Sequence, residues 1–260
     1  MNPYVIEIFS YEWFYTNLVS FSLIASFLIL ISVVLSKVAD INKWIIFLSK
    51  FLGCIFLFRF IFSQVYQIYN NLWYISYSLP LHLCGISVIV SIVVLLRFNQ
   101  NLYEFLFFIG FPGAIWSFLT PQINIYDPGM LFDNPGYMYI DYFVSHATIL
   151  FVPLYLTFFS SKKPRSNYWY KIFLKSNFFI IPVIFLINLF IYHILGVQDV
   201  NYIYLMNPPG ANNLFIIGGW PWYIIMMEIA CFVHAAIINF LFVRWNDFIN
   251  FFSLKKELLK

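Results

Sequence analysis

Charged residues are scarce in this chain: Asp, Glu, Lys and Arg together make up 10% of its 260 residues. A soluble domain usually carries about 25%. Because 62% of the residues are hydrophobic, the chain has too few polar groups to cover its own surface in water. The composition therefore excludes an ordinary soluble domain and indicates a multi-pass α-helical membrane protein. We expect membrane lipids as its partners, and no nucleic acid.

Several chemical signatures are also missing. The three cysteines, Cys54, Cys84 and Cys231, lie inside apolar runs and show neither CxxC nor Cys/His spacing, so a disulfide framework or zinc site is not expected. Walker A, GxSxG, HExxH and GxGxxG motifs are absent. The last apolar run contains no lysine, which argues against a retinal Schiff base. We therefore expect no metal and no cofactor.

The apolar runs predict an all-α membrane protein, a bundle of about seven transmembrane helices. Each run is long enough to cross a hydrocarbon core of about 30 Å. A re-entrant segment is the alternative for the fourth run, which contains Glu104, Pro112 and Gly113. The predicted spans are 17–36, 44–64, 72–96, 102–120, 138–160, 172–195 and 214–243.

Basic residues predict the orientation of this bundle. Alternate connections lack Lys and Arg altogether, as does the N-terminal segment. By the positive-inside rule, the N-terminus lies outside and the C-terminus in the cytoplasm, which suits a multi-pass protein of the cell membrane. The segments without Lys or Arg are 1–16, 65–71, 121–137 and 196–213.

Three regions are distinguished along the chain. Residues 1–16 form an outer segment, and the helical spacing of Tyr4, Ile8, Tyr11 and Tyr15 predicts a short interfacial helix within it. Residues 17–245 form the transmembrane domain, and 246–260 form a basic cytoplasmic tail. The outer connections 121–137 and 201–213 are rich in Pro, Gly, Asn and Asp, which predicts ordered caps over the outer face.

The run Leu79-Pro80-Leu81-His82-Leu83-Cys84-Gly85 places an imidazole and a thiol near the middle of the predicted span 72–96. Polar groups at that depth are expensive and usually functional. His82 and Cys84 are two residues apart, about 200° around a regular helix, so both reach one cavity only if the helix is deformed. Pro80 and Gly85 make such a deformation credible.

Other ionisable groups share the outer half of the bundle. An isolated charge there costs at least about 2.5–3.5 kcal/mol, so these groups should face inward and find partners. A buried ion pair between Arg59 and Glu228 is one such arrangement; a pairing of His82 with His146 and Arg59 is another. His193 and His234 are interpreted as interfacial or packing groups. The candidates for binding substrate are Arg59, Asp141, Tyr142, Trp220, Trp222 and Glu228.

Four stretches in this order resemble the YwaF-like bacterial integral membrane proteins: Leu79–Cys84, Ser145-His146 with Val152–Tyr155, Asn201–Leu205, and Trp220–Tyr223. More distantly, the chain is similar to eukaryotic membrane acyltransferases with a cysteine nucleophile and to threonine-dependent fatty-acid-ester hydrolases. That resemblance implies an intramembrane catalytic histidine, best matched by His146. The acyltransferase pattern has cysteine directly after the proline, where this chain has Leu81.

The leading hypothesis is a lipid acyltransferase or acyl-ester hydrolase with an outward-facing intramembrane cavity. His146 would be the general base, activating Cys84, a water or a hydroxyl. His82 and Arg59 would hold an oxyanion or an anionic headgroup. The alternatives are a transporter or small-molecule receptor that binds a polar ligand at Arg59, His82 and Glu228, and a structural role in which buried polar groups only select helix partners.

Overall fold

The computed structural model describes residues 4–123, 134–165, 168–210 and 214–257; side chains are described within these ranges except at 134–135 and beyond 241. Within them the chain is all-α apart from a short two-stranded sheet. Six helices are long and apolar enough to cross a membrane, and a seventh is shorter. The helices are α1 (Tyr11–Leu35), α2 (Ile41–Tyr69), α3 (Leu83–Leu96), α4 (Gln100–Phe105) continuing through η1 (Leu106–Gly110) into α5 (Phe111–Leu119), α6 (Asn134–Phe159), α7 (Trp169–His193) and α8 (Trp222–Glu257).

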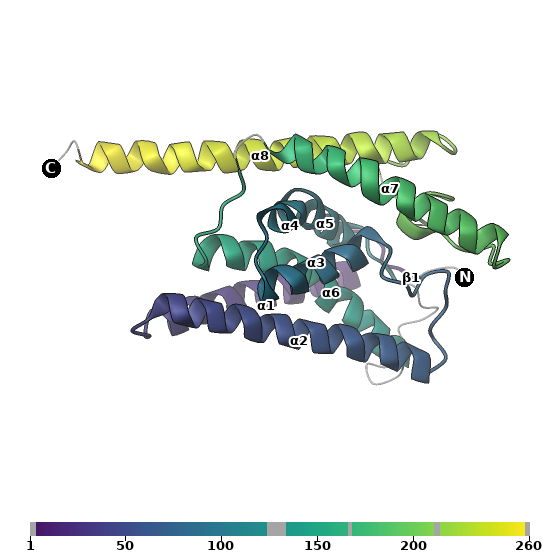
Figure 1. Ribbon diagram of the computed structural model, residues 1–260, viewed down its shortest axis with the longest axis horizontal. Coiled ribbons are helices and arrows are strands. Elements are labelled where there is room, and N and C mark those ends of the chain that lie inside the picture. Colours follow the sequence, from purple (N-terminus) through teal and green to yellow (C-terminus); the bar gives the residue numbers. More distant parts are fainter. Residues whose placement is uncertain (1–3, 124–133, 166–167, 211–213, 258–260) are drawn as a thin grey trace.

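The helices form three layers, with α3–α6 between the pair α1–α2 and the pair α7–α8 (Figure 1). The most apolar windows of the Gln100–Leu119 and α6 spans are 61% and 56% buried, against 22% for α1. Large apolar side chains of the outer helices, such as Phe58, Phe178 and Leu241, are exposed. Because no polar shell covers these side chains, the outer layers present the lipid-facing surface.

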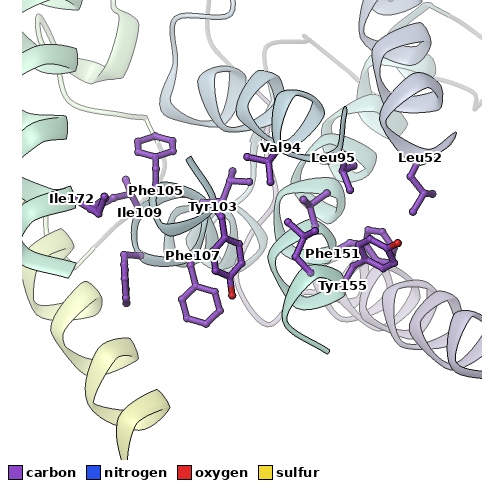
Figure 2. Close-up of a cluster of buried hydrophobic side chains, with 14 of the residues drawn as sticks. Leu52, Val94, Leu95, Tyr103, Phe105, Phe107, Ile109, Phe151, Tyr155 and Ile172 are labelled. Atoms are coloured by element: carbon purple, nitrogen blue, oxygen red, sulfur yellow. The ribbon is translucent and has the colours of Figure 1, made fainter. Parts of the chain in front are cut away.

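Aromatic and aliphatic side chains fill the middle layer. Figure 2 shows Tyr103 and Phe107 of the α4–η1 segment in the same cluster as Phe151 and Tyr155 of α6. Tyr103 and Tyr155 are fully buried, so their hydroxyl groups need partners. The Tyr103 hydroxyl lies 2.7 Å from Thr157 Oγ1, and the Tyr155 hydroxyl donates to the carbonyl of Ile45. The buried phenols therefore also link helices by hydrogen bonds.

The third predicted span, 72–96, is only partly helical. Turns and bends occupy the segment from Asn70 to His82, and helix α3 begins at Leu83. Pro80 lacks a backbone donor and disfavours helix for the residue before it, which explains why the helix does not extend back through this position. The apolar run predicts the membrane location, but one half of it is irregular backbone packed inside protein.

The fourth predicted span, 102–120, is helical as far as Leu119 through α4, η1 and α5, so its length and composition fit a full crossing rather than a re-entrant segment. The η1 turn is a π-helix, in which the Phe111 N–H reaches the Leu106 carbonyl five residues back. Pro112 follows directly and supplies no N–H to an α-helical ladder. The wider turn adapts the helix to this proline.

The N-terminal segment is not the predicted interfacial helix. Strand β1 (Tyr4–Val5) pairs antiparallel with β2 (Gln122–Ile123), with Tyr4 opposite Ile123. Helix α1 then begins at Tyr11, where the Ser10 hydroxyl accepts a hydrogen bond from the Trp13 N–H. Helical spacing predicted the wrong structure before residue 11 because strand pairing across the molecule overrides local periodicity.

The two ends of the bundle differ in charge. We call the end with the α2 N-terminus and the α3 and α6 C-termini the basic end, since its connections carry Lys37, Arg97, Lys162 and Arg165 among others. The opposite end, with connections 70–82, 120–133 and 194–221, has no Lys or Arg. Part of the predicted caps, at 124–133 and 211–213, lies outside the described residues.

Candidate functional site

A cavity of about 440 Å³ lies in the half of the bundle nearer the end without basic residues. Its wall comes from α2, the irregular segment before α3, α3 itself, η1, α5 and the stretch after it, α6, α8 and the connection after α7. The size falls in the range of small-molecule sites. Most of the lining is apolar, and the chemistry-bearing residues on the wall are Arg59, Ser63, His82, Cys84, Ser87, Asp141, Tyr142, Ser145, His146, Tyr204, Cys231 and His234.

His82 is the N-cap residue of α3 rather than a residue in mid-helix. Its Nδ1 accepts a long hydrogen bond, 3.4 Å, from the backbone N–H of Ile203. Its ring packs against Tyr202 and Tyr204, with centroids 5.1 and 5.5 Å away. A neutral imidazole that accepts at Nδ1 carries its proton on Nε2. His82 is therefore arranged as a hydrogen-bond donor.

The irregular segment before His82 is held by the connection after α7. The Tyr202 hydroxyl donates to the Ile75 carbonyl at 2.7 Å and accepts from the Leu79 N–H at 3.1 Å. Burial raises the pKa of Tyr202 to about 12, so the phenol keeps its proton. The amide of buried Asn188 in turn bonds both the N–H and the carbonyl of Tyr202. These bonds satisfy backbone groups that a helix would have paired internally.

His146 lies on α6 and is buried. Its Nδ1 is 2.7 Å from the backbone carbonyl of Tyr142, one turn earlier. A carbonyl can only accept, so Nδ1 carries the proton and Nε2, on the ring edge away from that carbonyl, has the free lone pair. His82 and His146 thus have opposite proton assignments: His82 offers a donor and His146 a base.

Cys84 occupies the second position of α3 and lines the same cavity as both histidines. Because His82 precedes the helix, the separation of about 200° expected for a continuous helix does not apply. In the first turn of a helix the backbone N–H groups have no intrahelical partners. Cys84 therefore lies at the start of a helix rather than in its interior.

Arg59 pairs with Asp141, not with Glu228. Arg59 Nη1 lies 2.5 Å from Asp141 Oδ1 and donates to Ser145 Oγ at 2.9 Å. The second carboxylate oxygen accepts from Ser63 Oγ at 2.9 Å. Among the described residues, Arg59 Nε has no hydrogen-bond partner. Asp141 is nearer to Arg59 because α2 and α6 approach at this level, which the spacing of charges along the chain does not reveal.

Three expected substrate-binding residues do not line the cavity. Trp220 and Trp222 are exposed, and the Trp220 indole N–H donates to the Leu205 carbonyl at 3.0 Å. Glu228 lies on α8 but outside the lining. Tyr142 does line it, and its hydroxyl donates to the Ser117 carbonyl at 2.9 Å.

The remaining histidines fit packing roles. His234 lines the cavity, but its Nδ1 lies 2.6 Å from the Ala230 carbonyl and its Nε2 accepts from the Trp116 indole at 3.0 Å. Both ring nitrogens are therefore occupied. His193 is exposed at the last residue of α7. Across the described residues, no three His, Cys, Asp or Glu side chains are grouped as metal ligands would be.

Sequence reasoning missed the supporting residues Asn188 and Tyr202. A signal was present for Asn188, the one amide in the apolar stretch 178–191, since such a group needs a buried partner. Ser87 is a second case: it is fully buried on the cavity wall, and its hydroxyl has no partner among the described residues.

Comparison with known proteins places the chain among membrane proteins. No curated protein and no solved structure matches it. The YwaF-like and acyltransferase resemblances are not among the matches. The sequence does match one family over residues 8–239, nearly its whole length. This polytopic membrane protein therefore belongs to the TMEM164 family.

Proposed function

We propose that the protein is a membrane-embedded enzyme that transfers or hydrolyses the acyl chain of a lipid, with Cys84 as nucleophile and His146 as general base. One observation carries the proposal: a base nitrogen, a donor nitrogen and a thiol at a helix N-terminus line one mostly apolar cavity. Acyl transfer needs these three functions together. The hydroxyls of Ser63 and Ser145, which also line the cavity, are engaged with the Arg59–Asp141 pair.

In the first half-reaction, His146 Nε2 takes the thiol proton of Cys84, and the sulfur attacks the carbonyl carbon of an acyl ester. The carbonyl oxygen becomes an oxyanion that accepts from His82 Nε2–H. The ester C–O bond then breaks, His146 returns the proton to the departing alcohol, and a thioester on Cys84 remains. In the second half-reaction, an alcohol or water attacks the thioester while His146 takes the proton of the attacking hydroxyl or water. The C–S bond breaks and the sulfur regains the proton.

Arg59 suits the headgroup of an anionic lipid substrate. Its bonds to Asp141 and Ser145 use one terminal nitrogen, and Nε is without a partner among the described residues. A guanidinium that retains donors is well matched to phosphate or carboxylate. The apolar lining would take the start of the acyl chain, and the substrate would enter laterally from the bilayer.

The proposal includes an orientation. The basic end is cytoplasmic, the N-terminus lies outside, and the cavity opens toward the outer side of the cell membrane. The distribution of Lys and Arg between the two ends supports this arrangement. Residues 1–16 remain the proposed outer segment and 246–260 the proposed basic tail.

The test is acyl release or transfer by purified protein in detergent with a labelled phospholipid. Cys84→Ala and His146→Ala should each lower turnover by at least about 100-fold, the usual contribution of a general base or more. Cys54→Ala and His193→Ala are matched controls, since Cys54 and His193 are exposed and lie outside the cavity lining. Wild-type turnover in His146→Ala would exclude the proposed base.

A transporter or receptor is the second candidate, favoured by the ion pair on the cavity wall, which could be exchanged for a polar ligand. Glu228, one of the three residues assigned to that function, is outside the lining. Uptake into proteoliposomes without chemical change of the solute would support this candidate over an enzyme.

A further inference from the structure

A second hollow of about 410 Å³ lies at the basic end, between the start of α2 and the ends of α3 and α6. It shares no lining residue with the larger cavity. Its lining includes Ile46, Lys50, Phe98, Ser160, Ser161 and Lys162. The two spaces are therefore separate sites at opposite ends of the bundle.

The charge of this basic-end hollow has one sign. Lys50 and Lys162 line it, and no Asp or Glu is among its lining residues. Neither lysine forms an ion pair within the described part of the chain, whereas Arg165 nearby is bound to Glu104 at 2.7 Å. The Lys162 ammonium lies 4.5 Å from the centroid of the Phe98 ring. Because no carboxylate in the lining neutralises these two ammonium groups, the hollow is suited to bind an anion.

Hydroxyl groups add donors to the same wall. The Ser160 Oγ is buried and has no partner among the described residues, although a buried hydroxyl normally has one. Ser161, two residues after the end of α6, has φ 52°, a conformation that glycine adopts more easily. The Lys162 N–H reaches the Leu156 carbonyl at 3.2 Å across this turn. A serine at this glycine-favouring position adds a further hydroxyl to the lining.

The hollow borders the lipid-facing surface. Ile46 and Phe98 belong to its lining, and both side chains are exposed. A soluble anion would gain nothing from these apolar side chains, while a lipid places its phosphate beside them naturally. Basic pockets between transmembrane helices on the cytoplasmic side are known binding places for lipid headgroups.

We propose that the hollow binds the phosphate headgroup of an anionic phospholipid, held by Lys50, Lys162 and the Ser160 hydroxyl, with the acyl chains along the exposed face of α2. This site is independent of the proposed acyl-transfer cavity. With the basic end in the cytoplasm, the lipid belongs to the inner leaflet, which is the leaflet that the positive-inside rule associates with basic loops.

Native mass spectrometry of the purified full-length protein in detergent tests the proposal, with phosphatidylglycerol and phosphatidylcholine of identical acyl chains as probes. Phosphatidylglycerol should bind more tightly. Each of Lys50→Gln and Lys162→Gln should weaken its binding about fivefold, and the double variant about 30-fold, from the contribution of one lysine near a charged lipid. Phosphatidylcholine binding should not change.

Lys163→Gln is the matched control, because Lys163 is an exposed neighbour of Lys162 that does not line the hollow. The charge-preserving Lys162→Arg should retain binding, which separates loss of charge from loss of folding. Equal binding of the two lipids, or an equal loss in Lys163→Gln, would overturn the proposal. So would inorganic phosphate at millimolar concentration that protects the protein from heat as well as the lipid does, since that result assigns the site to a free anion.

Discussion

The Arg59–Asp141 pair allows a quantitative prediction. Asp141→Leu removes the only carboxylate bonded to Arg59 among the described residues and the acceptor of the Ser63 hydroxyl. The two charged side chains are 18% and 15% exposed, so neither is fully rehydrated when its partner is lost. Leaving one buried charge unpaired costs about 3–5 kcal/mol, and the residual exposure favours the lower end, about 3 kcal/mol of unfolding free energy.

Removing both charges should cost much less. In Arg59→Met/Asp141→Leu no unpaired charge remains, and replacing a buried pair by apolar residues is neutral within about 1 kcal/mol or better. The predicted coupling free energy between the two substitutions is therefore at least about 2 kcal/mol. The double variant should be more stable than Asp141→Leu alone.

Reversible unfolding in mixed detergent micelles, followed by tryptophan fluorescence, would measure these free energies. Glu7→Gln is a control, since Glu7 is exposed. A double variant as unstable as Asp141→Leu would refute the reasoning, because the cost would then arise from lost packing or from Ser63 rather than from an unpaired Arg59.

Three further predictions concern the stability of the protein and its orientation in the membrane. Gly85→Ala would place a Cβ 2.8 Å from the Pro80 Cα, so it should destabilise by about 1–3 kcal/mol, whereas Gly219→Ala, with no atom within 4 Å, should not. Asn188→Leu leaves the N–H and carbonyl of Tyr202 without their partner and should cost about 2–4 kcal/mol; unchanged thermal unfolding would contradict the assigned bridge. A fluorescent protein fused to the C-terminus should fold in the cytoplasm, and absence of fluorescence from well-expressed fusion would reverse the proposed orientation.

Most of the fold prediction was based on the long hydrophobic runs in the sequence. The boundaries of five predicted spans fall near those of long apolar helices, because membrane thickness sets the length that such a helix needs. The span 214–243 matches less closely, since α8 begins at Trp222 and continues to Glu257. Span 72–96 differs most. Its composition satisfies the bilayer, but hydropathy does not report whether the backbone is helical when another segment supplies hydrogen bonds. Tyr202 supplies two of them from far along the chain.

The sequence predicted which residues belong to the candidate site better than it predicted the contacts between them. A polar group in an apolar run is conspicuous, so His82, Cys84, His146 and Arg59 could all be chosen from the sequence. Their contacts depend on how helices are rotated and paired, which a periodic pattern does not encode. The choice of Asp141 over Glu228 as the partner of Arg59 is such a case.

Glu104 illustrates a related limit of prediction from the sequence. In the sequence it only weakened the prediction of a fourth span. In the structure it is fully buried, and its carboxylate accepts from Arg165 through the backbone N–H at 2.8 Å and through the guanidinium. The ion pair ties the connection after α6 to α4. A carboxylate near a helix end is thus compatible with a spanning helix when a basic loop folds back over it.

The hydrogen bond between the Leu79 N–H and the Tyr202 hydroxyl also bears on biosynthesis. Its two ends are 123 residues apart. At about 5–20 residues per second, a ribosome needs about 6–25 seconds to make the intervening chain. During that interval the segment before α3 has neither its phenol nor a helical ladder, so its backbone must remain hydrated or shielded by another protein. Folding of this irregular segment is therefore a late event in membrane assembly, and truncation before Tyr202 should leave it exposed to quality-control proteases.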